Sequence, residues 1–439
     1  MKLNVKSTIL VGLAFLTISA FWQLYDFFVP LILLNTFGIG DDVSGFIMSL
    51  DNIVALFLLP LFGMISDRSQ TGIGRRMPYI LFGTLAASVF ILMIPYAAHS
   101  RNLPLFIAVL GLVLLSMAVY RSPAVALMPD ITPKPLRSKG NAIINLMGAV
   151  GGAMILLLNS FLAPDTKNPE TANYWPVFLI TVGIMLVGTL VLFLTVNEPK
   201  LVRKMRRDSA EAGIDPEEAE EAGQSIKVKK TRGPKLAPGV RRSMTFILAS
   251  ISLWFMGYNA VTTAFSKYAV TALGIDESKA SLILMVAVVV ATIAFVPVGI
   301  LSTRIGRRKS ILIGLALLTA VFGTASLYTQ YSPLMYVSFA LAGVAWASIN
   351  VNSLPMVLEM SKGASVGQYT GYYYTFSMSA QVITPILSGI LLERVGYFTL
   401  MPYGALFVGL AIVTMAMVRH GDSKPARAAG TLTLSQSAE

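Results

Sequence analysis

Residues 63–76 of this chain read GMISDRSQTGIGRR, and residues 299–309 read GILSTRIGRRK. Each stretch follows an apolar segment. The first ends in a Gly-Arg-Arg triplet, and the second ends one residue after such a triplet, so the same pattern occurs once in each half of the chain. A second correspondence lies further along, where an apolar segment closes on a carboxylic acid at Asp130 and again at Glu359. We predict from these matches that the chain is built from two related halves.

The composition places these halves in a membrane. Of the 439 residues, 55% are hydrophobic and 13% are charged, against about 25% charged residues in soluble domains. Crossing the bilayer takes about 20 mostly apolar residues per helix. We therefore predict an all-α membrane protein with twelve transmembrane helices in two pseudo-symmetric six-helix bundles, a plan known among transporters. The predicted spans are 8–36, 43–66, 78–98, 103–128, 140–163, 175–197, 243–271, 279–302, 310–329, 333–358, 369–391 and 397–418.

The distribution of positive charge predicts the orientation. Cytoplasmic loops of membrane proteins carry an excess of Lys and Arg, and with both termini in the cytoplasm most of the 34 such residues fall on that side. The other side carries Arg101, Lys167, Lys279 and Arg394. The predicted parts are an N-terminal bundle at 1–197, a cytoplasmic linker at 198–242, a C-terminal bundle at 243–420 and a cytoplasmic tail at 421–439. The linker is highly charged, which predicts a flexible segment.

Several classes of function are disfavoured. The chain has no cysteine, and His99 and His420 fall in predicted loop or tail, so we expect neither thiolate metal sites nor a histidine relay inside the membrane. No nucleophile–base pair, metal-ligand cluster or phosphate-binding loop is recognisable. We expect no enzymatic activity, cofactor or metal. The net charge of +12 follows the membrane topology and does not indicate nucleic acid.

The loop after the second predicted helix carries a family resemblance. Residues 63–76 resemble the signature of the major facilitator superfamily between its second and third helices. Three further stretches narrow the resemblance to the glycoside–pentoside–hexuronide cation symporters, in the branch near the sucrose and maltose transporters. They are residues 74–80 (GRRMPYI), 121–130 (RSPAVALMPD) and 141–151.

The resemblance implies a fold and a substrate class. It implies the major facilitator fold over about residues 8–420, and symport of a sugar or glycoside. Sodium symporters of the melibiose type carry two aspartates one turn apart on the second helix, where this chain has Ala55 and Leu59. The resemblance therefore favours a proton as the coupling ion. It also implies an integral protein of a bacterial or archaeal cell membrane, in contact with lipid.

Ionisable residues inside predicted spans are candidates for the mechanism, because a charge in hydrocarbon is costly unless it faces a cavity or a partner. At 1.5 Å of rise per residue, Asp26 and Asp51 lie at similar depths and could share one site. Burial disfavours the charged form of a carboxylate, so we take both as proton-coupling candidates; a structural hydrogen bond is the alternative. Arg121 lies about 14 Å from Asp26 in height, which predicts no direct ion pair. Lys267 lies near a membrane surface, where its side chain can extend to the interface.

The remaining candidates come from depth, from hydrogen-bonding capacity and from the resemblance. Residue Asn350 is related to Arg121 by the spacing that relates Glu359 to Asp130. The substrate-binding candidates are Gln23, Tyr25, Arg121, Asn145, Tyr258, Asn350, Tyr373 and Gln381. The gating candidates, which hold the halves together at the cytoplasmic side in the family, are Asp67, Arg68, Arg75, Arg76, Asp130 and Glu359. Each residue also has a plain structural interpretation, as packing or as a topological charge.

Two functions remain open at this point. The first is proton-coupled symport of a sugar or glycoside by alternating access. The second is export or exchange of drugs or other lipophilic solutes on the same fold, with Asp26 and Asp51 as acidic anchors for a cation. Arg121 and the three branch-specific stretches count against the second function.

Overall fold

The computed structural model describes residues 3–133, 136–162, 164, 172–211, 237–360 and 366–422. Helices account for nearly all of these residues. In the N-terminal half they are α1 (Val5–Leu31), the π-helical turn η1 (Ile32–Thr36), α2 (Asp41–Arg68), α3 (Met77–His99), α4 (Leu103–Ile131), α5 (Arg137–Leu162), α6 (Trp175–Thr195) and α7 (Glu198–Glu211). In the C-terminal half they are α9 (Pro238–Thr271), α10 (Glu277–Ile305), α11 (Arg307–Ala325), α12 (Leu334–Glu359), α13 (Val366–Arg394), the short 3-10 helix η3 (Tyr397–Thr399) and α14 (Leu400–Ala416).

The predicted spans are confirmed. Twelve helices in the described part are long and apolar enough to cross a membrane. Backbone hydrogen bonds close within each helix, which is what hydrocarbon requires. Two helix starts have side-chain caps: the side chains of Asn4 and Asn102 accept backbone N–H groups of the first turns of α1 and α4, at 3.2 and 3.0 Å.

The linker prediction is wrong for its first part. Residues 198–211 form the amphipathic helix α7 instead of a flexible segment, and its buried Glu198 is bound to the loop before α3. The C-terminal half begins at Pro238, within the predicted linker. The rest of the predicted linker, 212–236, lies outside the described residues, as does most of the predicted tail.

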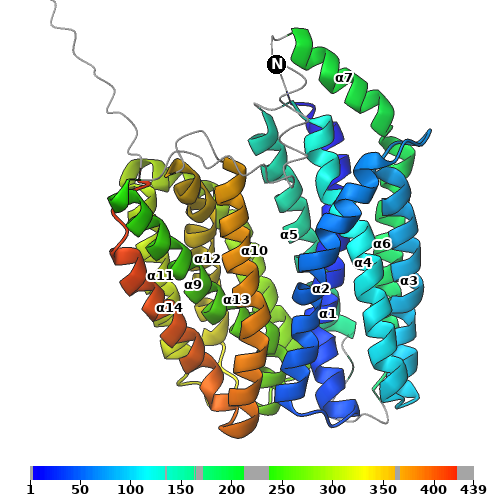
Figure 1. Cartoon of the computed structure of the whole chain (residues 1–439). Coiled ribbons are helices and arrows are strands. Elements are labelled where there is room, and N and C mark those ends of the chain that lie inside the picture. The colour runs from blue at the N-terminus through cyan, green and yellow to red at the C-terminus, as the bar shows by residue number, and fades with distance from the viewer. Residues whose placement is uncertain are drawn as a thin grey trace, which may run out of the picture.

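The helices form two bundles, α1–α6 and α9–α14, which stand side by side (Figure 1). Between the bundles, α2 packs on α13, α5 on α10 and α1 on α9. Figure 1 shows the bundles close together at one end and apart at the end that carries α7 and the N-terminus. We name these ends the opposite end and the α7 end.

Backbone contact between α2 and α13 depends on glycine. A Cβ atom on Gly45 would overlap the carbonyl oxygen of Pro385, and one on Gly389 would overlap the carbonyl oxygen of Asp41. Small residues allow helices to approach this closely in membranes. These contacts lie near the start of α2 and the end of α13, so they join the halves at the opposite end.

Candidate functional site

The midspans of α1 and α4 bring a cation and an indole together. The guanidinium carbon of Arg121 lies 5.6 Å from the ring centroid of Trp22, within the range of a cation–π interaction. Three residues further along α1, the ring of Tyr25 packs against Trp22 at 5.6 Å in an edge-on arrangement. The sequence interpretation included Arg121 and Tyr25 but missed Trp22, because apolar packing is the usual role of a tryptophan in a membrane helix.

Two carboxylates lie in the same region. Asp26 of α1 and Asp51 of α2 are close enough for their charges to interact, and Asp51 also interacts with the charge of Arg121. The carboxylate of Asp51 accepts hydrogen bonds from the backbone N–H and side-chain amide of Asn52, at 2.6 and 2.7 Å. Tyr374, on α13 of the other half, lies near Arg121. Within the described part of the chain, no ion pair joins Arg121 to Asp26.

Several polar groups of this region have no hydrogen-bond partner among the described residues. The indole nitrogen of Trp22 and the hydroxyl of Tyr25 are buried and unpaired. Neither the guanidinium of Arg121 nor the carboxylate of Asp26 hydrogen-bonds to another residue of the described ranges. Buried polar groups are normally paired, so this cluster has the capacity to bind a polar solute.

The C-terminal half has an aromatic cluster of its own. Tyr258 of α9 and Trp346 of α12 stack in parallel, with ring centroids 3.7 Å apart and an interplanar angle of 5°. Phe255 meets Trp346 edge-on at 5.5 Å. Tyr258 was a substrate-binding candidate, whereas Trp346 gave no signal in the sequence beyond its position in the middle of a predicted span.

The other substrate-binding candidates have varied surroundings. The hydroxyl of Tyr373 is 3.1 Å from that of Ser353, inside the C-terminal half, and the amide of Gln381 donates to the carbonyl of Ser377 on its own helix at 3.4 Å. Gln23 and Asn350 are half-buried, and Asn145 is exposed. These residues stay candidates on position alone.

Most of the gating candidates pair within one half. The buried guanidinium of Arg76 binds the carboxylates of Asp67 and Asp130, the latter at 2.8 Å. Arg75 binds Asp130 at 3.0 Å, and in the second repeat Arg307 binds Glu359 at 3.3 Å. Arg68 is exposed. These ion pairs connect helices of one bundle at the α7 end, and none of them connects the two bundles.

Two carboxylates that the sequence interpretation missed make equivalent contacts in the two halves: each accepts hydrogen bonds from the backbone of the arginine pair. Glu198 accepts hydrogen bonds from the backbone N–H groups of Arg75, Arg76 and Met77, at 2.8 to 3.1 Å. Asp422 accepts from the N–H groups of Arg307 and Arg308, at 2.7 and 3.4 Å. Carboxylates are favourable at helix N-termini, and α3 and α11 begin here.

The glycine before each arginine pair allows this contact. Gly74 and Gly306 have φ angles of 120° and 94°, which side chains rarely adopt, and a Cβ on either would press on the carboxylate. The Gly-Arg-Arg triplet therefore has a local structural role in both halves.

At the opposite end, a buried ion pair joins the halves. The ammonium of Lys267 on α9 binds the carboxylate of Asp41 at the start of α2, and the hydroxyl of Ser44 lies 3.3 Å away. The backbone N–H of Asp41 donates to Glu393 of α13 at 2.6 Å. The expectation that Lys267 extends to the membrane interface is wrong, because a partner on the other bundle holds it in the protein interior.

A second contact closes the same end. The hydroxyl of Ser281, on α10, donates to the carbonyl of Leu156, on α5, at 2.6 Å. The hydrogen bonds found between the halves in the described part thus gather at the opposite end, where the bundles meet.

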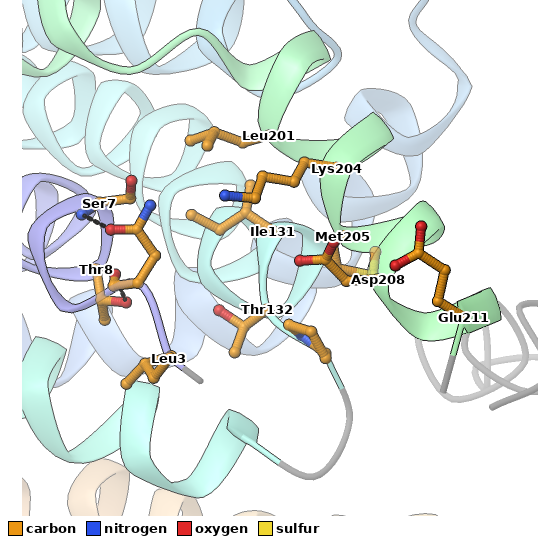
Figure 2. A pocket seen from close by; sticks show the side chains of 12 residues that line it. Leu3, Ser7, Thr8, Ile131, Thr132, Leu201, Lys204, Met205, Asp208 and Glu211 are labelled. Atoms are coloured by element: carbon orange, nitrogen blue, oxygen red, sulfur yellow. Dashed lines mark hydrogen bonds between the residues drawn. The ribbon is translucent and has the colours of Figure 1, made fainter. Parts of the chain in front are cut away.

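A separate pocket of about 370 Å³ lies at the α7 end, between α1, α4 and α7 (Figure 2). Its lining includes Asn4, Thr132, Met205 and Asp208. Asn4 precedes Trp22 by eighteen residues, or about 27 Å along a helix. The pocket is therefore distinct from the Trp22–Arg121 region, and we do not place the substrate in it.

Comparisons with known proteins agree with this architecture. The chain matches the Major Facilitator Superfamily over residues 11–276 and 247–434. It is similar in fold to the xylose transporter XylE from E. coli in an inward-open conformation, with a TM-score of 0.65 and 15% identity, covering 96% of this chain and 97% of that one. It is also similar to the nucleoside transporter NupG, with a TM-score of 0.66 and 14% identity over 95% and 100% of the two chains.

Curated relatives match over part of their length. An alpha-ketoglutarate permease from Escherichia coli is 31% identical over 182 residues, which are 40% of this chain and 38% of the relative. The sucrose transport protein SUC3 from Arabidopsis thaliana is 25% identical over 186 residues, or 36% of this chain and 31% of the relative. The chain thus matches less than half of each relative. On the extent of the family match, this membrane protein belongs to the major facilitator superfamily.

Proposed function

We propose that the protein is a secondary transporter that carries a sugar or glycoside together with a proton, by alternating access. The observation that carries the proposal is the set of unmade hydrogen bonds around Trp22, Tyr25, Asp26 and Arg121. These groups offer both donors and acceptors, and sugar hydroxyls are both as well. Aromatic faces beside polar groups are typical of preformed small-molecule sites.

The charges around Arg121 support proton coupling. Asp26 and Asp51 with one guanidinium carry a net negative charge when both acids are ionised, and one proton neutralises the group. Isolated net charge is costly at membrane depth. A conformational change that moves the site from one side of the membrane to the other would therefore favour the protonated, neutral group.

The contacts between halves support alternating access with a closed opposite end. Lys267, Asp41, Ser281 and Leu156 join the bundles there, while Arg75 and Arg76 bind partners of their own half at the α7 end. In the proposed orientation the α7 end is cytoplasmic, as the excess of Lys and Arg predicts. The arrangement would then be the one open toward the cytoplasm.

Export of lipophilic cations is the alternative function. Asp26 and Asp51 supply the acidic groups that a cation needs. Arg121, however, already places a positive charge near Asp51. This charge favours a neutral polar solute over a cationic one.

Purified protein in liposomes tests the proposal. With an imposed proton gradient, we expect accumulation of at least one sugar from a panel of sucrose, maltose and methyl glucosides, with proton influx at the same time. Alpha-ketoglutarate and a cationic dye are the comparison solutes. Uptake of alpha-ketoglutarate alone would replace the substrate class, and extrusion of the dye without movement of any sugar would favour the exporter.

A further inference from the structure

Trp22 is held in one orientation by neighbours on several sides. Its ring face lies under the guanidinium of Arg121 at 5.6 Å, and the rings of Phe21 and Tyr25 meet it edge-on at 5.0 and 5.6 Å. Such aromatic contacts prefer defined geometries. The direction of the indole N–H is therefore fixed by packing before any solute arrives.

The indole N–H of Trp22 has no acceptor among the described residues, although it is buried, and the same holds for the hydroxyl of Tyr25. Residues three apart lie on one face of a helix, so both donors belong to one side of α1. Leaving a buried donor unpaired carries the full cost of removing that donor from water. Aromatic packing explains the positions of the two rings but does not explain why the N–H of Trp22 and the hydroxyl of Tyr25 both lack an acceptor.

The chemistry around these donors indicates what satisfies them. Arg121 adds a planar fork of N–H groups that are likewise free of hydrogen bonds within the described ranges. Asp26 and Asp51 are the carboxyl groups of the region, and one oxygen of Asp51 already accepts two hydrogen bonds from Asn52, whereas the donors of Trp22, Tyr25 and Arg121 are all unused within the described residues. A solute with several oxygen acceptors close together complements this arrangement, whereas an apolar or purely cationic solute does not.

We propose that Trp22 positions the substrate: its ring face holds Arg121, and its indole N–H donates to an oxygen of the bound solute. The hydroxyl of Tyr25 donates to a neighbouring oxygen of the same solute. That the solute is a sugar rests on the proposed function, whereas the assignment of the two donors requires only an oxygen-rich ligand. Trp22 thus selects solutes by the position of one acceptor oxygen.

Conservative variants separate the two roles of Trp22. Trp22→Phe keeps an aromatic face for Arg121 and removes the N–H, while Trp22→Leu removes both. Trp175→Phe, at the start of α6, is the matched control because Trp175 is exposed and remote from Arg121. Affinity is measured on purified protein from ligand-induced thermal stabilisation, with sucrose, maltose, monodeoxy analogues of both sugars, glucuronate and alpha-ketoglutarate.

We expect Trp22→Phe to weaken the affinity for the bound solute by about 3- to 10-fold, the contribution of one hydrogen bond. Trp22→Leu weakens it further, and Trp175→Phe leaves it unchanged. One monodeoxy analogue should bind the wild-type protein more weakly than its parent sugar does, by the same factor. The Trp22→Phe variant should bind that analogue and the parent sugar equally well. This coupling between one substrate oxygen and one protein N–H would not arise from a merely structural role.

Each outcome decides between the two proposals. If Trp22→Phe binds every ligand as the wild type does, or if each analogue is penalised equally in both proteins, the Trp22 assignment is wrong while sugar transport stands. If only alpha-ketoglutarate binds and Trp22→Phe weakens it, the sugar proposal fails and the assignment of Trp22 holds. Binding of no panel member overturns both. Tyr25→Phe, which removes only a hydroxyl, provides the same analogue test if Trp22→Phe does not fold.

Discussion

The ammonium of Lys267, on α9, binds the carboxylate of Asp41, the first residue of α2, in the interface between the two halves. The side chains are only 5% and 3% exposed. The pair exists only while the bundles touch at the opposite end, so a transporter that works by alternating access must break it in each cycle. Breaking a buried pair by removing one partner is costly because it leaves a buried charge uncompensated.

We predict that loss of either partner opens the opposite end. Lys267→Met or Asp41→Asn should raise the labelling rate of a cysteine at Thr263, which lines the small void beside this pair, at least about tenfold. The chain has no cysteine, so a single Thr263→Cys substitution provides a clean reporter. The measurement is reaction with a membrane-impermeant maleimide added from the side of the opposite end.

The charge-swapped double variant, Asp41→Lys with Lys267→Asp, is the control for this experiment. It should restore slow labelling, because the pair is re-formed with exchanged charges. Equal labelling rates in the wild type and both single variants would show that the glycine contacts close this end without help from the ion pair.

The backbone contact between α2 and α13 leads to a second prediction. Gly45→Ala should destabilise the closed opposite end, since the added Cβ overlaps the carbonyl of Pro385 in rigid helix backbone. We expect a lower midpoint of thermal unfolding and faster labelling of the Thr263→Cys reporter. Gly111→Ala on α4 is the control, because nothing lies within 4 Å of its added Cβ; equal effects of the two substitutions would contradict the prediction.

The sequence predicted the twelve spans and the two-bundle plan because hydropathy and the positive-inside bias act locally along the chain. It also placed Asp26, Asp51 and Arg121 in the membrane, and these three charges interact in the structure. The partner of Lys267 could not be predicted from the sequence. Asp41 lies on the other half, and no local pattern relates two residues that meet only when the bundles close.

Other residues were missed for a related reason. Glu198 follows the sixth span within a charged segment, and only the packing of α7 shows that its carboxylate reaches the start of α3. Trp22 is one of many aromatic residues in apolar helices, and its unpaired N–H is visible only when its neighbours are known. Side-chain pairing, more than helix position, is what the sequence left undetermined.

Asp26 is expected to couple transport to the proton. Asp26→Asn keeps the size and hydrogen-bonding capacity of the side chain but cannot exchange a proton, so accumulation driven by a proton gradient should fall to the level of the gradient-free control. Counterflow exchange of the same sugar should persist, because exchange does not require the transporter to change conformation without bound sugar. Both are measured with radiolabelled sugar in liposomes.

Two results would argue against this role. Full accumulation by Asp26→Asn would remove Asp26 from proton coupling. Loss of exchange as well as accumulation would place Asp26 in substrate binding, as an acceptor for a sugar hydroxyl. Asp51→Asn, tested in parallel, distinguishes the two acids, since Asp51 is already bonded to Asn52.

Glu198 should be important for stability although it lies outside the membrane spans. Its buried carboxylate satisfies three consecutive N–H groups at the start of α3, and Glu198→Ala leaves all three without an acceptor. We expect a loss of about 3 kcal/mol of stability, since hydrogen bonds to charged groups contribute more than neutral ones. Glu198→Gln should lose less, because one amide oxygen still accepts.

Glu211→Ala is the control on the same helix: its partner Arg207 is exposed, and no measurable shift is expected. Thermal unfolding in detergent provides the comparison, and equal midpoints for Glu198→Ala and Glu211→Ala would mean that α7 does not hold the start of α3.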